Sequence, residues 1–307
     1  MYKPKVIVIC GPTASGKTAL SIELAKKING EIISCDSMQI YKDMNVGTAK
    51  VTEDEMQGIC HYLIDFVSPD ERYSVADYKV DSEKAIEKII SKGKIPIIVG
   101  GTGLYVDSLI YGIEYPEIKF DEKYRNKLEK EADEKGLETL YNKAKEIDEQ
   151  AMQKISINDR KRIIRVLEIY HATGKNKTEQ EIESRKKEIK YDYKIFAINM
   201  DREKLYERIN IRVDRMIENG LIEEVENLQK KYNHFPTAMQ GLGYKEVIEY
   251  LQSQITREEM IEKIKQESRR YAKRQLTWFR KNKQTIWIDG LANLEDNINI
   301  IEQEINK

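Results

Sequence analysis

The feature that most constrains this chain is a short glycine-containing segment near its N-terminus. It consists of Gly11, Pro12, Thr13, Ala14, Ser15, Gly16, Lys17 and Thr18, the pattern G-x-x-x-x-G-K-[ST]. An apolar run, residues 5–10, directly precedes it, and a helical pattern over residues 19–27 follows. A buried strand, a glycine-rich turn and a helix N-terminus aim several backbone N–H groups at one anion. The segment therefore predicts a phosphate-binding loop, although an ordinary strand-turn-helix with chance glycines is the alternative.

Two side chains of this loop have expected roles in such a site. The ammonium of Lys17 is expected to reach the terminal phosphates, and the hydroxyl of Thr18 is expected to ligate Mg²⁺. The loop does not specify which polyphosphate is bound.

The first hundred residues predict an α/β fold with a parallel sheet. Apolar runs at residues 31–35 and 95–99 are separated by a helical stretch at residues 75–91. Continuous apolar runs alternating with helices are typical of parallel strands that are covered on both faces. Ligands of such sheets bind beyond the carboxyl ends of the strands, where residues 36–39 and 100–105 are also expected.

The middle of the chain has a different character. Residues 115–191 are rich in lysine and glutamate, have helical periodicity and nearly lack strand signals. We interpret them as an inserted all-helical subdomain, so that residues 1–114 and 192–307 together form the core domain. Its best-defined helix is expected to begin near residues 156–159 and to end near Gly174.

That helix is expected to carry an apolar stripe made of Ile163, Ile164, Leu167 and Tyr170. Farther along, the patterns predict a strand at residues 194–200, a helix at 202–220, a long helix at 257–281 and a strand at 285–289. We expect the last strand to close the sheet.

Composition limits the classes of protein. The chain of 307 residues has a formal net charge of −1, and no apolar run approaches the roughly 18 residues that a membrane span requires. The first strand begins almost at once, which leaves no room for a signal peptide. Cys10, Cys35 and Cys60 lie in or beside apolar stretches and are expected to be reduced core residues. We expect a cytoplasmic protein that is a monomer and does not contact a membrane.

The basic residues are unevenly distributed. Residues 269–283 include seven basic residues, no acidic residue, and the aromatic residues Tyr271, Trp278 and Phe279. A second basic cluster lies at residues 160–165. Aromatic rings among cations favour RNA, because bases stack on the rings while Lys and Arg meet phosphates. A solvated helix face is the alternative for any such run.

Several motifs together resemble one family, the bacterial tRNA dimethylallyltransferases, which prenylate the adenosine next to the anticodon. The motifs are residues 11–18, 36–41, 47–50, 100–105, 160–164, 243–246 and 273–280, in the expected order. The resemblance implies that the loop at residues 11–18 binds the diphosphate of dimethylallyl diphosphate. It also implies a P-loop NTPase-like sheet, Mg²⁺ as the cofactor and the anticodon stem-loop of tRNA as the partner.

The resemblance implies catalytic roles for three residues. Asp36 is expected to be the general base that accepts a proton from the adenine amine, with helix capping or Mg²⁺ ligation as its alternatives. Thr102 is expected to position the same adenine. Arg212 is expected to contact the diphosphate, although the sequence alone favours an arginine on a helix surface.

The resemblance also implies tRNA contacts. They are Asp36, Ser37, Met38, Gln39, Thr102, Arg125, Arg160, Lys161, Arg162, Ile163, Ile164, Gln240, Gly241, Leu242, Gly243, Tyr244, Lys245, Lys273, Arg274, Gln275, Thr277, Trp278 and Arg280. For Gln39 the alternative is a turn residue, and for Trp278 it is a core aromatic.

The function expected from these observations is transfer of a dimethylallyl group to the exocyclic amine of the adenosine 3′ of the anticodon, in tRNAs that read codons beginning with U. One alternative is a small-molecule kinase with the same loop. Another is an RNA-binding GTPase, but its guanine-reading motif Asn-Lys-x-Asp is missing, because Asn282-Lys283-Gln284 is followed by Thr285.

Overall fold

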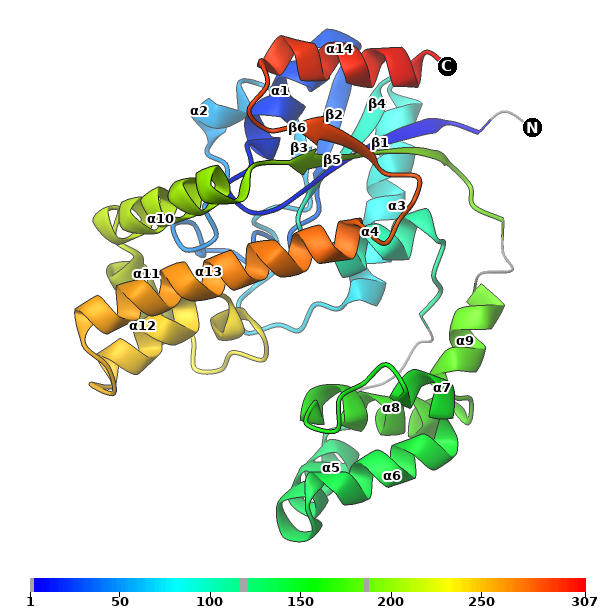
Figure 1. Ribbon diagram of the computed structural model, residues 1–307, viewed down its shortest axis with the longest axis vertical. Coiled ribbons are helices and arrows are strands. Elements are labelled where there is room, and N and C mark those ends of the chain that lie inside the picture. Colours follow the sequence, from blue (N-terminus) through cyan, green and yellow to red (C-terminus); the bar gives the residue numbers. More distant parts are fainter. Residues whose placement is uncertain (1–2, 116–120, 185–187) are drawn as a thin grey trace. The chain divides into compact units, whose positions relative to one another are not determined.

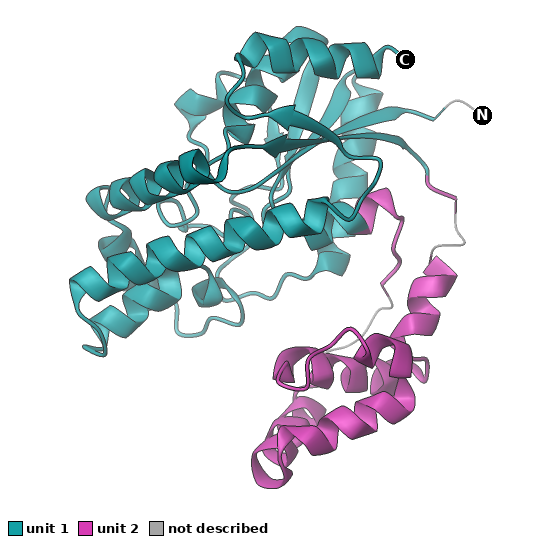
Figure 2. Cartoon of the chain, in the orientation of Figure 1, with its two compact units in different colours: residues 1–107, 190–307 teal, residues 108–189 magenta. Residues whose placement is uncertain are grey.

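The computed structural model describes residues 3–115, 121–184 and 188–307. The chain divides into two compact units, the first formed by Met1–Asp107 with Lys190–Lys307 and the second by Ser108–Ile189 (Figure 2). The subdomain predicted at residues 115–191 falls largely within the second unit.

The first unit is built on a parallel sheet, which confirms the predicted α/β fold. In the described residues the sheet has six strands in the order β3-β2-β4-β1-β5-β6. The strands are β1 (Lys5–Cys10), β2 (Gly30–Ser34), β3 (His61–Tyr62), β4 (Ile95–Gly100), β5 (Asp192–Asn199) and β6 (Ile286–Asp289). Cys10 pairs with Gly100 on one side and Ala197 on the other, so these three strands reach the same edge of the sheet.

Helices cover the sheet and extend beyond it (Figure 1). In the first unit they are α1 (Lys17–Ile28), α2 (Glu53–Met56), α3 (Val75–Ser91), α10 (Arg202–Glu218), α11 (Leu221–Lys231), η1 (Ala238–Gln240), α12 (Tyr244–Leu251), α13 (Arg257–Phe279) and α14 (Leu294–Ile305), while α4 (Gly103–Ile110) crosses the boundary between the units. α1 and α14 pack together on one face of the sheet (Figure 1). Alternate residues of the central strand, such as Ile7 and Ile9, are completely buried against them.

A second core joins the loop after β2 to the helices α10–α13. Ile40, Tyr41 and Met44 from the loop pack with apolar residues of α11, α12 and α13, among them Val225 and Met260. This packing holds the loop beside α10 and α11 at the end of the sheet where the phosphate-binding loop lies.

The second unit is helical and has its own core. Its helices in the described residues are α5 (Glu122–Lys135), α6 (Leu137–Ile147), α7 (Glu149–Met152), α8 (Arg160–Thr173) and α9 (Lys177–Ser184). α8 begins after Asp159, whose carboxylate accepts a hydrogen bond from the Arg162 N–H, and it ends at Gly174 in the left-handed conformation.

The structure corrects two expectations about burial. Tyr170 was expected on the apolar stripe of α8 but is 44% exposed, because it lies in the last turn of this helix, after the buried residues 163, 164 and 166–169. Cys10 and Cys35 are buried as expected, whereas Cys60 is exposed, since it lies in the loop before the short edge strand β3. No helix within the described ranges is long and apolar enough to span a membrane.

Candidate active site

The phosphate-binding loop connects β1 to α1 and has the conformation of an anion cradle. Ala14 and Gly16 have φ angles of 62° and 93°. Alternation of left-handed and right-handed residues makes successive N–H groups converge on a point, and Gly16 lies directly before the first turn of α1. The buried hydroxyl of Ser15 has no partner among the described residues. The cradle therefore offers unused donors where an anion is expected.

Lys17 lies folded over this loop. Its Nζ donates hydrogen bonds to the carbonyl oxygens of Gly11 and Pro12, at 3.1 and 2.7 Å. Burial and the nearby guanidinium of Arg212 together lower the pKa of Lys17 to about 8, and the carboxylate of Asp36 opposes both effects. The lowered pKa means that the protein disfavours the charged form of Lys17, and a bound anion would stabilise that form.

Arg212 on α10 is the second cation of the site. Its Nη2 donates to the carbonyl oxygen of Thr48 at 3.2 Å, while its buried Nε has no partner among the described residues. Burial also lowers the pKa of Arg212, and Asp36 opposes that shift. A buried donor without an acceptor requires an explanation, and a diphosphate oxygen would supply one. The geometry is not that of an arginine on a helix surface.

Asp36 follows β2 and begins a turn rather than a helix. Its Oδ1 accepts hydrogen bonds from the N–H groups of Met38 and Gln39, at 2.9 and 3.3 Å. In the described part of the chain, Oδ2 accepts no hydrogen bond. One oxygen thus fixes the orientation of the carboxylate and leaves the other available for a proton or a metal ion.

Thr102 joins the loop after β4 to the turn that begins at Asp36. Its hydroxyl oxygen accepts a hydrogen bond from the Ser37 N–H at 3.0 Å, and its own N–H donates to the Cys35 carbonyl oxygen at 3.1 Å. Tyr271, on α13, lies in the same surroundings: burial raises the pKa of its phenol, the carboxylate of Asp36 raises it further, and the Thr102 side chain opposes the rise. Thr102 is therefore tied by hydrogen bonds to both residues that flank Asp36.

Gln275 and Trp278, two residues predicted to contact tRNA, make hydrogen bonds within the protein. The buried amide of Gln275 accepts a hydrogen bond from the Thr13 N–H and donates one to the Gly101 carbonyl oxygen, both at 2.9 Å. The indole of Trp278 covers Gly103, where a Cβ would lie 2.4 Å from the ring, and donates to Asp107 at 2.9 Å. For Trp278 the alternative, a packing aromatic, describes the geometry.

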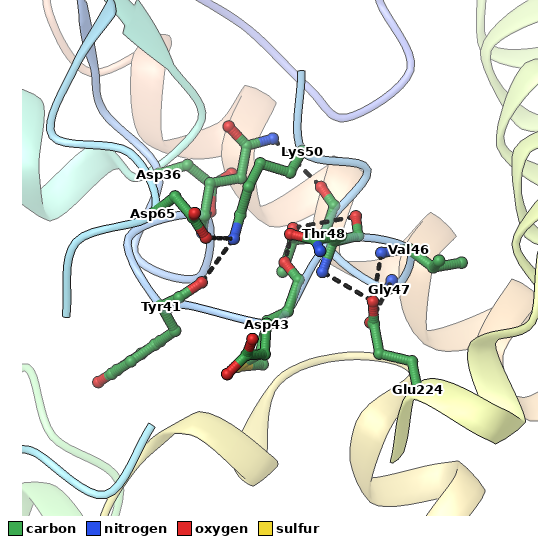
Figure 3. A network of polar contacts seen from close by, with 12 residues as sticks. Asp36, Tyr41, Asp43, Val46, Gly47, Thr48, Lys50, Asp65 and Glu224 are labelled. Atoms are coloured by element: carbon green, nitrogen blue, oxygen red, sulfur yellow. Dashed lines mark hydrogen bonds and ion pairs between the residues drawn. The ribbon is translucent and has the colours of Figure 1, made fainter. Parts of the chain in front are cut away.

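The segment that follows Asp36 is anchored by polar contacts (Figure 3). The side-chain amide of Gln39 donates to the carbonyl oxygens of Thr48 and Ala49, at 3.2 and 3.1 Å. The ammonium of Lys50 donates to the Tyr41 carbonyl oxygen at 2.6 Å and pairs with Asp65. Gln39 therefore has the geometry of a turn-stabilising residue.

The predicted tRNA contacts of the second unit divide into exposed and buried residues. Arg160 pairs with Glu129 and Asp133, Arg125 pairs with Glu168, and Lys161 and Arg162 are exposed. Ile163 and Ile164 are 0% exposed and belong to the core of this unit, so their side chains are not at its surface, and a contact with tRNA at these positions stays a prediction.

The remaining predicted contacts lie on α13 and around the start of α12. Lys273, Arg274, Thr277, Arg280, Gln240 and Lys245 are exposed, Ser37, Met38 and Leu242 are partly exposed, and Gly241, Gly243 and Tyr244 are buried. The buried phenol of Tyr244 donates to Glu224 at 2.6 Å, so its side chain is a structural donor, and a tRNA contact at this position stays a prediction. Sequence reasoning did not single out Glu224, because a glutamate in a helix carries no signal of its partners.

Mg²⁺ is the remaining group that the resemblance implies for this site. The described residues contain no cluster of three His, Cys, Asp or Glu side chains that could hold a metal ion. Mg²⁺ at a phosphate site needs only one or two protein oxygens, because phosphate and water supply the rest. The exposed hydroxyl of Thr18 and the available Oδ2 of Asp36 are oxygen donors of this kind.

Comparison with known proteins relates the whole chain to one family. Residues 39–282 match the family model described as IPP transferase. The tRNA dimethylallyltransferase of Acetivibrio thermocellus is 55% identical over 285 residues, 92% of this chain and 91% of that protein. The tRNA dimethylallyltransferase of Bacillus anthracis is 47% identical over 289 residues, 94% of this chain and 92% of that protein.

Solved structures agree with this relationship. The tRNA isopentenylpyrophosphate transferase of Bacillus halodurans is 42% identical with a TM-score of 0.74, and the match covers 99% of this chain and 96% of that one. A eukaryotic dimethylallyltransferase acting on tRNA is 33% identical with a TM-score of 0.82, and the match covers 99% of this chain and 80% of that one.

Proposed function

This chain belongs to the IPP transferase family, and from that premise we propose that it is a tRNA dimethylallyltransferase. It transfers a dimethylallyl group from dimethylallyl diphosphate to the exocyclic amine of the adenosine 3′ of the anticodon, in tRNAs that read codons beginning with U, and it releases diphosphate. The observation that carries this proposal is the buried Nε of Arg212, which has no acceptor among the described residues and whose charge helps to lower the pKa of Lys17.

The leaving group is the main electrostatic task of this reaction. As the C–O bond of the donor breaks, negative charge accumulates on the diphosphate, and fixed donors stabilise that charge without reorganising. The N–H groups of residues 14–18, the ammonium of Lys17 and the guanidinium of Arg212 supply such donors.

The nucleophile also needs help, because the lone pair of the adenine amine is delocalised into the ring. As the new C–N bond forms, Oδ2 of Asp36 accepts the amine proton, while Oδ1 stays bonded to the turn. Thr102 holds the adenine at this position. Mg²⁺ would be held by Thr18 and the diphosphate, with Asp36 as a competing ligand, and its charge would further neutralise the leaving group.

The target base must leave the stack of the anticodon loop to reach the carboxylate. Lys273, Arg274 and Arg280 on α13 are exposed cations that suit phosphate contacts on such a loop. This substrate also supports a cytoplasmic location, and we propose that the protein acts as a monomer.

The test is incubation with dimethylallyl diphosphate, Mg²⁺ and unmodified tRNA, followed by mass analysis of the anticodon-loop nucleosides. A parallel reaction contains ATP in place of the prenyl donor. Gain of one dimethylallyl group on the adenosine supports the proposal, whereas phosphoryl transfer from ATP with no prenylated nucleoside would favour the kinase alternative.

A further inference from the structure

Glu224, near the start of α11, makes an unusual number of hydrogen bonds to one short loop (Figure 3). Its Oε2 accepts from the N–H groups of Asn45 and Val46, at 2.8 and 2.7 Å. Its Oε1 accepts from the Gly47 N–H at 3.0 Å and from the Tyr244 phenol at 2.6 Å. Three consecutive backbone donors thus depend on one carboxylate.

The loop held by Glu224 presents carbonyl oxygens to the candidate active site. The carbonyl oxygen of Thr48 accepts hydrogen bonds from Arg212 Nη2 and Gln39 Nε2, both at 3.2 Å. Arg212 is the proposed diphosphate ligand, and Gln39 belongs to the turn that begins at Asp36. The Thr48 carbonyl is thus the point where the loop contacts both the cation and the turn.

The surroundings of Glu224 favour a charged, closely packed acceptor. Burial raises the pKa of Tyr244, and the Glu224 carboxylate raises it further, so the phenol stays protonated and donates. A Cβ at Gly47 would lie 2.6 Å from the Tyr244 ring and 2.8 Å from Leu221, so only glycine lets the loop approach this closely. A neutral amide in place of the carboxylate would have one acceptor oxygen and would turn an NH₂ group toward N–H donors.

We propose that Glu224 is a positioning residue for the donor site: it fixes the loop at residues 45–47 and thereby the Thr48 carbonyl that orients the guanidinium of Arg212. The inference rests on the proposed function only for the identity of the prenyl donor, because its structural part concerns binding of a diphosphate. Glu224 acts through Arg212 and touches no reacting atom.

The first test measures the affinity of the full-length protein for inorganic diphosphate with Mg²⁺ by titration calorimetry. Glu224→Gln is expected to weaken binding by at least about tenfold, the size of a hydrogen bond to a charged group. Glu223→Gln is the matched control, because Glu223 lies in the same first turn of α11 and its substitution removes the same charge. It is exposed and makes no hydrogen bond to the loop in the described structure, so its affinity is expected to stay within about twofold of the parent.

A double-mutant cycle separates positioning from general damage to the fold. In an Arg212→Ala background, Glu224→Gln is expected to cause no further loss of diphosphate affinity, because the group that it positions is gone. An equal loss in both backgrounds, or identical affinities for Glu224→Gln and Glu223→Gln, would overturn the proposal.

Two further measurements keep the test decisive. If Glu224→Gln does not fold, Tyr244→Phe removes only one of the four hydrogen bonds. It is expected to weaken diphosphate binding by about twofold to fivefold, and this effect is expected to disappear in the Arg212→Ala background. Unchanged affinity contradicts the proposal.

Prenyl transfer to tRNA is assayed on the same proteins. If the substitutions of Glu224 and Tyr244 weaken diphosphate binding as expected but the parent protein prenylates no tRNA, the proposed function fails while the positioning role of Glu224 stands.

Discussion

Asp36 has one carboxylate oxygen engaged by backbone N–H groups and the other available to a substrate. Asp36→Asn keeps a carbonyl oxygen that can accept the same two hydrogen bonds, but the amide cannot accept a proton at neutral pH. We expect kcat to fall by about 10²–10⁴-fold, with diphosphate affinity little changed. Single-turnover kinetics and diphosphate titration measure the two quantities. Turnover close to that of the parent would exclude Asp36 as the base.

Lys17 makes donor binding dependent on pH. Its pKa in the free protein is lowered from 10.5 to about 8 by burial and by Arg212, with Asp36 opposing. Diphosphate prefers the protonated lysine, so affinity is expected to be constant below about pH 8. As the pH rises above this value, affinity falls by up to about tenfold per pH unit.

Titration with dimethylallyl diphosphate between pH 7 and 10 measures this dependence. In Lys17→Arg the fall is expected to disappear, because arginine stays charged over this range. An affinity of the unsubstituted protein that does not change up to pH 10 would show that Lys17 does not titrate in the free site.

Some residues of the site could be predicted from short sequence motifs, whereas others could not. The loop at residues 11–18 and Asp36 are visible in the sequence, because both directly follow an apolar strand. Gln275 and Glu224 contact loops 262 and 177–179 residues away in the sequence. No spacing rule connects such positions, so only the folded chain shows their partners.

At the scale of elements, α13 anchors the phosphate-binding loop through Gln275. Replacing Gln275 by Ala leaves the Thr13 N–H and the Gly101 carbonyl without their partner. We expect the free energy of unfolding to fall by about 1–3 kcal/mol and diphosphate binding to weaken. Gln229→Ala, at an exposed position on α11, is the control for denaturant unfolding. If Gln275→Ala and Gln229→Ala have the same free energy of unfolding, the hydrogen bonds of Gln275 do not stabilise the fold.

The exposed face of α13 is where we expect electrostatic contact with RNA. Replacing Lys273, Arg274 and Arg280 by Ala should weaken tRNA binding and reduce the slope of log affinity against log salt by about two to three. The control replaces Lys84, Lys230 and Lys307, three exposed lysines outside α13, by Ala. If both triple variants change the slope equally, α13 presents only a solvated charged face.

Elements with both a clear period and clear ends were predicted best. The expected helix at residues 75–91 matches α3, whose start is fixed by a capping box between Ser74 and Asp77. β3 has two residues and α14 occupies a polar C-terminal segment, and neither was predicted. A strand of two residues has no measurable alternation, and the apolar face of α14 gains its meaning only from packing on α1.

At the scale of the whole molecule, the sequence predicted the class of the fold but not the sheet order. Continuous apolar runs indicated parallel strands, and the structure confirms an all-parallel sheet. β5 lies beside β1 although the second unit separates them in the chain. The pairing of β5 with β1 depends on long-range packing, which the hydrophobic periodicity of the sequence does not reveal. The late strand forms the edge of the sheet beside β5, as expected for a strand that completes it.

The most direct test of the account uses one tRNA in two forms, with adenosine or guanosine at the position 3′ of the anticodon. Each is incubated with dimethylallyl diphosphate and Mg²⁺, and both released diphosphate and prenylated nucleoside are quantified. The account predicts one diphosphate per prenylated adenosine, with the dimethylallyl group on the exocyclic amine, and no reaction with the guanosine form. Absence of prenylated adenosine, or diphosphate release that does not depend on that base, would contradict it.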